Sequence, residues 1–418
     1  MKNLRIYTKT NGKYIIEVLD LKHPSVYGDI IRAIKFAENK PKIRGIYIDF
    51  RKIYSYSYPN CIVPIAGIME YYNKIENLNL KLININNSYL KKTQFNKPKV
   101  ITKTEIYKNK DSVFNRVWKF TNPSEAQTIA ENLFSNVSQE LNCEKGVINA
   151  MSWCVNEVMD NTLRHSKINE GYFMCQIHHH TKRLIFTLFD YGIGFFNSFI
   201  PSDYTPSNDK EALEMALSKN VTSDKKDGQG FGLWGLQSII KSNNGYLNIA
   251  SRSSAYIYEN IKRKRDQFFD ISYLSSQNGS VLVDFQLNYE NAINLDDILE
   301  GGNYESFQQL IEDIEDENTS LKFLINEKSE GTGTRNAGLK TRTLLTNIFN
   351  ETSNWIIIDF ENVKYITSSY ADECIAKLVE KIGEETFAKR FRLKHLNEDI
   401  QKIISFAINE RLKVNQKT

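Results

Sequence analysis

The sequence predicts an α/β multidomain protein in which a central layered α/β sandwich is flanked by two smaller α/β units. The first observation is a helical stretch, Met151–Ser166, with polar residues along one side and apolar residues along the other. The second is a pair of glycine-rich turns further along the chain, at 190–195 and 228–233. The third is a short apolar strand followed by a helix, which occurs near both ends of the chain.

Length and composition are those of a soluble protein with more than one domain. The chain has 418 residues, 41% of them hydrophobic and 25% charged, so about two to four domains are expected. No apolar run approaches the roughly 20 residues that span a bilayer, and the first residues lack the apolar core of a signal peptide. The five cysteines form no C-x-x-C pair. We therefore expect a cytoplasmic protein with reduced thiols and no membrane partner.

Four segments are expected along the chain. Residues 1–120 form one small α/β unit and residues 121–290 form the central sandwich. Residues 291–318 form an acidic linker, because this part of the sequence is dense in carboxylates and has no basic residue. Residues 319–418 form the second small α/β unit.

The two small units resemble each other. Ile356–Phe360 matches Ile46–Phe50 at four of five positions, and each run is typical of a buried parallel strand followed by a crossover helix. The next strand expected in the C-terminal unit, Phe391–Leu396, keeps the register of Lys81–Asn86 in the N-terminal unit. Two explanations of this match remain open: an internal repeat, or the general likeness of any two units built from a buried parallel strand and a crossover helix.

Hydrophobic periodicity predicts the elements of the central sandwich. A helix is expected over 123–141, with Pro123 at its first position. The polar segment 196–227 is expected to be a mobile cover with one short helix around Lys210–Ser218. Five strands are expected, at Gly171–His178, Arg183–Phe189, Tyr246–Ala250, Phe268–Leu274 and Ser280–Leu287.

Three polar residues stack along the helix of Met151–Ser166. Glu157, Asn161 and His165 are four residues apart and share one side of the helix. The amide oxygen of Asn161 suits Mg²⁺, a hard cation that prefers oxygen ligands. Glu157, one turn away, could take a proton from an attacking water. His165 either contacts a phosphate or ends the helix.

The first glycine-rich turn follows a strand that ends at Asp190. Alternation along the strand directs this carboxylate into the concave end of the domain. There it can accept a hydrogen bond from the exocyclic amine of adenine, whereas guanine offers a carbonyl. Gly192 and Gly194 lack the Cβ atoms that would keep the backbone away from the base.

The second glycine-rich turn contains Gly228, Gly230 and Gly232 and leads into a helical pattern that begins at Leu233. Backbone N–H groups at the N-terminus of a helix, together with the positive end of the helix dipole, suit the phosphates of a nucleotide. The two turns and the polar helix together predict a nucleotide site.

The ordered set E-x-x-x-N, D-x-G-x-G and G-x-G-x-G-L resembles the GHKL ATPase superfamily of gyrase, heat-shock chaperone, histidine kinase and MutL. The resemblance covers about 121–290. It implies a GHKL (Bergerat-type) α/β sandwich that binds ATP and Mg²⁺, with Asn161 on the metal and Asp190 on adenine. It also implies Glu157 as the candidate base.

A further pair, Gly279-Ser280, lies ahead of the last expected strand. It looks like the Gly-Thr pair that lies beside the adenine aspartate in the GHKL superfamily, so Ser280 joins the cofactor-binding residues. The alternative explanation is that the motifs are unrelated: two ordinary glycine turns and the polar face of a helix.

The C-terminal unit carries a second resemblance. Its segments G-T-R-N-A-G-L-K-T-R (333–342) and V-K-Y-I-T-S-S-Y-A-D-E (363–373) are similar to a STAS-like domain of unknown function that often accompanies GHKL modules in bacteria. STAS domains of the anti-sigma antagonist kind are phosphorylated by GHKL serine kinases on a serine in this place. Ser368 and Ser369 are therefore candidate phosphosites. The alternative is a capping box in which Ser369 starts the helix and Asp372 follows three residues later.

The resemblance extends to the N-terminal unit through the matched strands. It implies a GHKL sandwich flanked by two small STAS-like α/β units. The N-terminal unit has Ser57–Asn60 where the C-terminal unit has its serines, so a shared phosphosite is not expected there.

Three functions remain open. The preferred one is a Mg-dependent ATPase or ATP-driven switch that signals through the flanking units to an unidentified protein partner, in bacterial regulation or defence. The second is a serine/threonine kinase that acts on a STAS-like serine; a histidine kinase is disfavoured because no histidine lies between His23 and His165. The third is a nucleotide-stabilised nucleic-acid-binding module that uses the basic segments 91–110 and 262–265. A homodimer is also left open.

Overall fold

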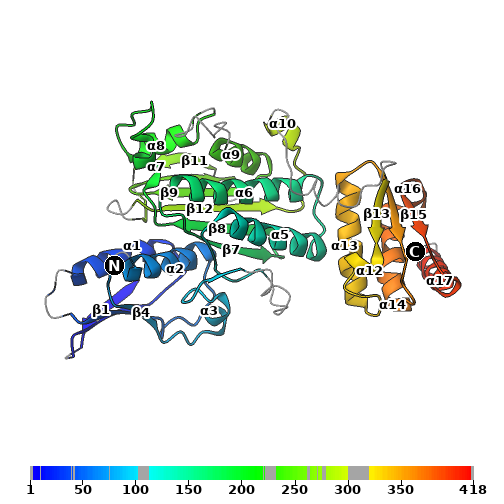
Figure 1. Ribbon diagram of the computed structural model, residues 1–418, viewed down its shortest axis with the longest axis horizontal. Helices are drawn as coiled ribbons and strands as arrows, with labels where there is room; N and C mark the ends of the chain where they lie inside the picture. Colours follow the sequence, from blue (N-terminus) through cyan, green and yellow to red (C-terminus); the bar gives the residue numbers. More distant parts are fainter. Residues whose placement is uncertain are drawn as a thin grey trace. The chain divides into compact units, whose positions relative to one another are not determined.

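The computed structural model of the chain is shown in Figure 1. It describes residues 3–9, 11–38, 40, 43–74, 76–101, 113–219, 221, 232–260, 264–270, 272–274, 279–299 and 320–415. The expected α/β multidomain architecture, with several separate sheets, is confirmed. Within the described ranges no helix combines the length and the apolar character needed to cross a membrane.

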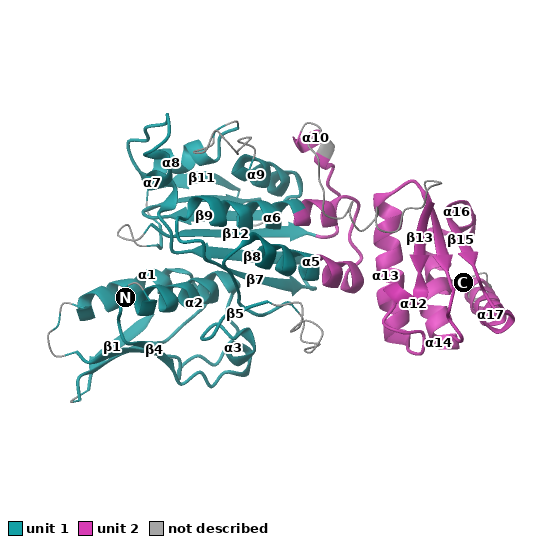
Figure 2. Ribbon diagram, in the orientation of Figure 1, with its two compact units in different colours: residues 1–133, 153–288 teal, residues 134–152, 289–418 magenta. Residues whose placement is uncertain are grey.

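The chain forms two compact units, coloured separately in Figure 2. The first contains Met1–Leu133 and Trp153–Asn288, and the second contains Phe134–Ser152 and Tyr289–Thr418. The chain passes between the units inside two helices, α5 (Pro123–Glu140) and α6 (Val147–His165). Part of the segment expected for the central sandwich therefore groups with the C-terminal residues.

The N-terminal part of the first unit is a four-stranded sheet with two crossover helices. In chain order its elements are β1 (Leu4–Thr8), β2 (Lys13–Val18), α1 (Ser25–Glu38), β3 (Gly45–Asp49), α2 (Pro59–Lys74) and β4 (Leu80–Ile83). The first two strands are antiparallel, and β2, β3 and β4 are parallel. Every second residue of these strands faces the helices; Ile16 and Ile48 are fully buried there, and Ile6 and Leu82 are partly buried. Burial of this apolar face holds the helices on the sheet.

The larger part of the first unit is an eight-stranded sheet. In spatial order its strands are β11 (Arg265–Phe269), β10 (Ser254–Glu259), β9 (Tyr246–Ser251), β12 (Val281–Asn288), β8 (Arg183–Asp190), β7 (Gly171–His178), β6 (Trp118–Phe120) and β5 (Lys99–Val100). All neighbours are antiparallel except β5 and β6. β5 and β6 fall within the 1–120 range expected for the N-terminal unit, yet they pair in this second sheet. A short helix, α3 (Ser88–Thr93), precedes them.

Helices cover both faces of the eight-stranded sheet. α2 packs against β7 and β8, and Figure 1 places α1 and α2 between the two sheets of this unit. On the other side, α9 (Gly232–Ser242) packs against β9 and β12. Two more helices, α7 (Gly194–Phe199) and α8 (Asp209–Ala216), lie in the segment expected as a cover. The expected short helix in that segment is thus present.

Side chains alternate between the two faces of β8. Phe189 faces α1, where its ring lies 5.5 Å from that of Tyr27. Phe186 faces the opposite way and stacks on Phe285 at 4.8 Å. Asp190, four residues after Phe186, is therefore on the α9 side of the sheet.

The second unit is built on three parallel strands, β13 (Ser320–Leu324), β14 (Trp355–Asp359) and β15 (Phe391–Lys394). Its helices are α10 (Leu295–Leu299), α12 (Ile325–Lys328), α13 (Arg335–Glu351), α14 (Ser368–Ala371), the π-helix η1 (Asp372–Ala376), α15 (Lys377–Ile382), α16 (Glu384–Arg390) and α17 (Glu398–Asn415). α13 and α17 each pack against η1. Most of the expected acidic linker, residues 300–318, lies outside the described residues.

Within the second unit, a buried asparagine of α13 holds the segment 134–152. Asn347 of α13 donates from Nδ2 to the carbonyl oxygens of Ser138 (2.9 Å) and Leu141 (3.0 Å), and its Oδ1 accepts from the N–H of Cys143 (3.0 Å). One turn later, Glu351 accepts from the N–H of Gly146 at 2.8 Å. These bonds satisfy backbone groups at the end of α5 and before α6 that would otherwise be unpaired.

The central strands of the two small sheets end in the same way. Asp49 and Asp359 are both fully buried, and each accepts from the backbone N–H two residues later, at 3.0 and 2.9 Å. The neighbouring strands pair Ile46 with Leu80 and Ile356 with Phe391. The matching register is therefore Leu80 with Phe391, one residue away from the register expected from the sequence.

Candidate functional site

The two residues expected to act on phosphate and metal lie together on α6. Asn161 donates from Nδ2 to Oε1 of Glu157 at 2.8 Å. Burial raises the pKa of Glu157, and the hydrogen bond from Asn161 offsets part of this effect. The hydrogen bond uses the amide nitrogen of Asn161, and its amide oxygen is the atom that could bind a cation.

The third glycine of the second turn meets this pair. Gly232 is the first residue of α9, and a side chain at this position would overlap Oε1 of Glu157 and approach Nδ2 of Asn161. Leu233 follows as a buried residue of the same helix. A larger residue here would displace the carboxylate of Glu157, because α9 begins directly against the polar side of α6. Gly228 and Gly230 lie outside the described residues.

Asp190 ends β8 as a buried carboxyl group. Its side chain is 4% exposed, and Oδ1 accepts from the N–H of Gly192 at 2.8 Å. Burial raises the pKa of Asp190 to about 7, although the hydrogen bond from Gly192 acts in the opposite direction. A carboxyl group with this pKa can change its protonation state near neutral pH, which is common at functional sites.

Gly192 and Gly194 allow close packing of the backbone after Asp190. A side chain on Gly192 would overlap Ser166, the residue that follows α6. Gly194 has a φ of +73°, and a side chain there would overlap the carbonyl oxygen of Gly279. The missing Cβ atoms thus make room for protein backbone; the role of these glycines in admitting a base stays a prediction. These contacts hold the loop after β8 between the end of α6 and the start of β12.

The N-terminal unit contributes a residue to this region that the sequence did not reveal. Tyr27 of α1 is fully buried; burial raises the pKa of its hydroxyl group, and the nearby Asp190 carboxyl raises it further. Ser280 is fully buried just before β12, and its hydroxyl group partly offsets this rise in the pKa of Tyr27. No local pattern around Tyr27 distinguishes it from an ordinary core tyrosine, so its proximity to Asp190 depends on the packing of α1 on the sheet.

An ionic cluster fixes the residue after Asp190. Tyr191 donates to Glu170, which also accepts from Nζ of Lys119 at 2.7 Å. Lys119 in turn lies 3.2 Å from Glu70 of α2. Burial alone would raise the pKa of Glu170, but the hydrogen bonds from Lys119 and Tyr191 lower it to about 2. The cluster therefore holds the Asp190 loop to the N-terminal unit with an ionised carboxylate.

The segment expected as a cover is anchored at α8. Asp209, the first residue of α8, accepts from the N–H of Ser253 at 3.2 Å and pairs with Arg252 at 2.8 Å. The carbonyl group of Asp209 also accepts from the hydroxyl group of Ser254 at 2.9 Å. These bonds tie the start of α8 to the turn between β9 and β10. Residues 220 and 222–227 of the expected cover lie outside the described residues.

In the second unit, the candidate phosphosites lie at the start of α14. The helix cap is Thr367, whose hydroxyl group accepts from the N–H of Tyr370 at 3.1 Å. This corrects the expected capping box, in which Ser369 was the cap. Thr367, Ser368 and Ser369 each carry a hydroxyl group that could cap the helix, and in the structure Thr367 is the residue that does so. Ser368 and Ser369 are exposed at the first two positions of the helix.

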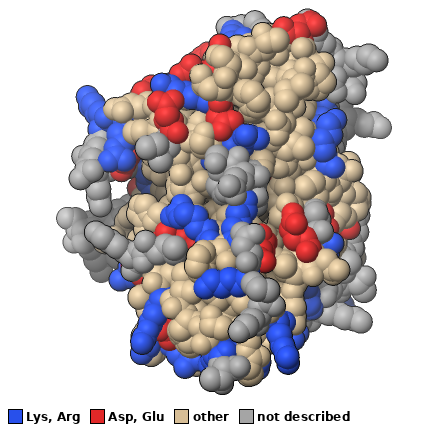
Figure 3. Space-filling model, turned by 90° about the vertical axis from the view of Figure 1, so that its left-hand side faces the viewer, with Lys and Arg blue, Asp and Glu red and all other residues tan. Residues whose placement is uncertain are grey.

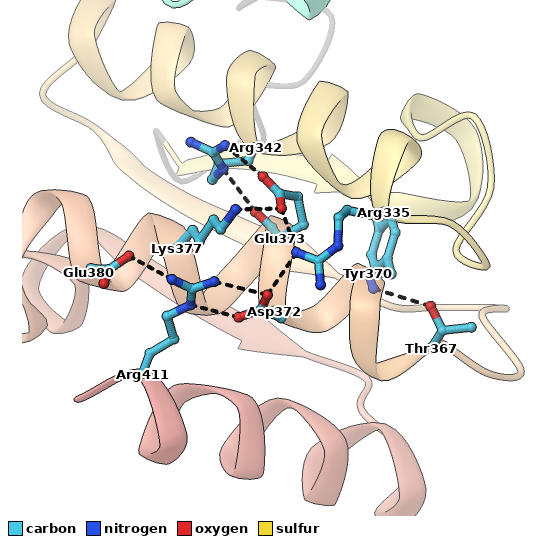
Figure 4. A network of polar contacts seen from close by, with 9 residues as sticks. All are labelled: Arg335, Arg342, Thr367, Tyr370, Asp372, Glu373, Lys377, Glu380 and Arg411. Atoms are coloured by element: carbon cyan, nitrogen blue, oxygen red, sulfur yellow. Dashed lines mark hydrogen bonds and ion pairs between the residues drawn. The ribbon is translucent and has the colours of Figure 1, made fainter. Parts of the chain in front are cut away.

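A network of charged side chains surrounds the π-helix that follows α14 (Figure 4). Glu373 accepts from Arg342 (2.9 Å), Lys377 (2.7 Å) and Arg335 (2.9 Å). Arg335 also bonds Asp372, as does Arg411 of α17. Burial alone would raise the pKa of Glu373, but the three cations lower it. The network joins α13, η1 and α17, and π-helices often mark functional positions.

Three residues that can each offer a metal ligand gather at the end of β14. Asp359, Glu361 and His395 bring their ligand atoms within 4.8 Å of one another. However, Nζ of Lys322 lies 3.1 Å from Asp359 and 3.4 Å from Glu361. The lysine supplies the positive charge that the carboxylates need, so the cluster is explained without a metal ion.

Comparison with known proteins identifies one part of the chain. No curated protein matches the sequence. Residues 342–401 match the family model of a STAS-like domain of unknown function (DUF4325). The matched range contains Arg342, the start of α14 and the cluster at Asp359, whereas Arg335 and Arg411 lie outside it. The C-terminal resemblance predicted from the sequence is confirmed: the chain contains a STAS-like domain at its C-terminal end.

Proposed function

We propose that the first unit binds ATP with Mg²⁺ as a GHKL-type domain and that the protein is an ATPase or an ATP-driven switch. The observation that carries the proposal is the convergence of three separate sequence motifs on α6. Gly232 lies against Glu157 and Asn161, and the loop after Asp190 lies against Ser166 at the end of the same helix. Residues far apart in the sequence that meet in this order support a single nucleotide site.

Each residue has a chemical role in this proposal. Asp190 accepts a hydrogen bond from the amine of adenine, and the N-terminus of α9 faces the phosphates. Mg²⁺, when bound, would neutralise phosphate charge, and the amide oxygen of Asn161 is its protein ligand. Glu157 takes a proton from the attacking water, because burial makes its carboxylate more basic than usual.

The metal role of Asn161 gives the first test. Asn161→Ala is expected to abolish Mg²⁺-dependent ATP binding in calorimetry, because it removes the only proposed side-chain ligand. Thr162→Ala is a matched control on the same helix; Thr162 is buried and donates within the helix to the carbonyl oxygen of Val158 at 3.1 Å. Unchanged ATP affinity in Asn161→Ala would remove this residue from the metal site.

The titration of Asp190 gives the second test. With a pKa of about 7, Asp190 is mostly ionised at pH 8 and mostly protonated at pH 6. The ionised form is the stronger acceptor for the amine of adenine, so ATP affinity should fall from pH 8 to pH 6, by about tenfold at most. The phosphates of ATP titrate in the same range, and Asp190→Asn controls for them. The ratio of wild-type to Asp190→Asn affinity should therefore fall with pH, and a constant ratio would contradict the adenine role.

The helix that carries the site also provides a route for signalling. α6 begins among residues of the second unit, where Gly146 bonds Glu351, and it continues into the first unit to Glu157 and Asn161. The proposed switch therefore rests on chain connectivity: residues 147–152 of α6 group with the second unit, and Glu157 and Asn161 group with the first. A protein partner would read the nucleotide state through the STAS-like domain.

A serine/threonine kinase is the second candidate, favoured by the exposure of Ser368 and Ser369 at the start of α14. In this case the γ-phosphate is transferred to a hydroxyl group of a STAS-like domain, here or in a partner. Incubation with γ-labelled ATP would place label on the protein, and Ser368→Ala/Ser369→Ala would remove it. Label retained in the double variant would move the phosphosite elsewhere.

A further inference from the structure

One face of the N-terminal sheet carries exposed basic and aromatic side chains. Residues such as Ile16 and Ile48 point toward α1 and α2, so the residues between them in sequence point away. We call this second face the open sheet face and define it by five residues: Arg5, Tyr7, Lys13, Tyr47 and Lys81. Figure 1 shows no described helix or strand over this side of the sheet.

The two tyrosines lie in one row across the strands. Tyr7 pairs with Ile15, Ile15 with Tyr47, and Tyr47 with Lys81. Ile15 is buried, whereas both tyrosine rings are partly exposed. The tyrosines are two strands apart, which places them about 10 Å from each other. This spacing suits two bases of a single strand, each stacked on its own ring.

Basic side chains surround this row. Nζ of Lys13 lies 5.2 Å from the ring centre of Tyr47. Arg5, Lys13 and Lys81 are exposed, and no described carboxylate forms an ion pair with any of them. The two acidic residues on the same face are occupied instead, because Arg51 pairs with Asp49 at 2.5 Å and with Glu17 at 3.7 Å. The cations of the open sheet face are therefore available to an anionic ligand.

The charge of the N-terminal segment agrees with this surface. Residues 1–100 contain 18 Lys and Arg but only seven Asp and Glu, whereas the whole chain has a net charge of only +4. Three of these acids, Glu17, Asp29 and Asp49, are buried. Figure 3 shows the left-hand side of the molecule as drawn in Figure 1, and in its lower part, at the height of β1 and β4, blue side chains outnumber red ones. A polyanion is the charge-complementary partner of such a surface.

We propose that the open sheet face binds single-stranded nucleic acid. Bases stack on Tyr7 and Tyr47, while phosphates contact Arg5, Lys13 and Lys81. The face is distinct from the basic segments 91–110 and 262–265, which lie partly outside the described residues. The inference does not depend on the ATP site, because none of its residues takes part there.

The test is fluorescence anisotropy of a labelled oligothymidylate with the full chain at increasing salt. Arg5→Gln/Lys13→Gln/Lys81→Gln should weaken binding about tenfold or more and reduce the slope of log affinity against log salt by about 2. A matched control, Lys364→Gln/Lys389→Gln/Lys402→Gln, removes the same charge from exposed positions of the second unit and should bind as the wild type does. Equal loss in the two triple variants would overturn the proposal.

Variants of the tyrosines separate stacking from simple charge attraction. Tyr7→Leu and Tyr47→Leu should each weaken binding roughly 5- to 150-fold, whereas Tyr7→Phe and Tyr47→Phe keep the ring and should retain affinity. Single strands should bind more tightly than a duplex of equal length, because paired bases cannot stack on the rings. Equal affinity for the duplex, or binding only to vesicles of anionic lipid, would contradict the assignment.

Discussion

Glu157→Ala is expected to bind ATP and to release phosphate about 10²–10⁴-fold more slowly than the wild type, the usual contribution of a general base. The structure gives the physical reason. Glu157 is largely buried against Gly232, and burial raises its pKa, so that its carboxylate is a stronger base than an exposed glutamate. Its hydrogen bond from Asn161 fixes the orientation of both side chains. Steady-state phosphate release, with ATP affinity measured separately, checks this prediction.

Two further variants isolate the role of the carboxylate. Glu157→Gln keeps an oxygen that accepts from Asn161 but cannot take a proton, so it should be as slow as Glu157→Ala. Asp160→Ala removes a carboxylate from the next turn of the same helix, where Asp160 is 46% exposed and pairs with Arg164 at 2.7 Å. This control should hydrolyse ATP normally. Phosphate release that is unchanged in Glu157→Gln would rule out Glu157 as the base.

Asn347→Ala is expected to destabilise the second unit by about 3 kcal/mol or more. The amide of Asn347 is 1% exposed and makes three hydrogen bonds, to Ser138, Leu141 and Cys143. Its removal leaves buried backbone groups without this partner, at a cost of about 1–3 kcal/mol for each group that stays unpaired. Urea denaturation measures the loss, and hydrogen exchange should accelerate at the N–H of Cys143.

Asn350→Ala is the matched control for this prediction. Asn350 is less buried and makes one hydrogen bond to the same segment, from Nδ2 to the carbonyl oxygen of Cys143 at 3.1 Å. Its loss should cost about 1 kcal/mol. Equal destabilisation by the two variants would mean that Asn347 does not hold residues 134–152 to α13.

The sequence predicts those elements that have a strong local pattern. The bounds of β7 and β12 were predicted to within one residue. Both strands carry apolar side chains that are buried on both faces of the sheet, and this gives a strong local pattern. β11, Arg265–Phe269, is a polar strand that forms only because β10 pairs with it, and a strand was expected later, at 268–274. The hairpin of β1 and β2 went unpredicted, although Asn11-Gly12 between them is a hairpin signal.

In the candidate site too, the contacts between residues close in sequence could be predicted, and the contacts between distant segments could not. The helical spacing of Glu157 and Asn161 is local, so their hydrogen bond could be expected from the sequence. The contacts of Gly192 with Ser166 and of Gly194 with Gly279 join distant segments, and no local pattern contains them. Tyr27 is the clearest case, because only the packing of α1 on the sheet brings it near Asp190.

One incubation with γ-labelled ATP and Mg²⁺ tests the central claim most directly, when free phosphate and protein-bound label are scored in the same sample. The account predicts that label accumulates as free phosphate with the wild-type chain. With Asn161→Ala no free phosphate should accumulate, and with Glu157→Ala it should accumulate much more slowly than with the wild type. Label that remains entirely in ATP with the wild-type chain, or phosphate release that survives in Asn161→Ala, would contradict it.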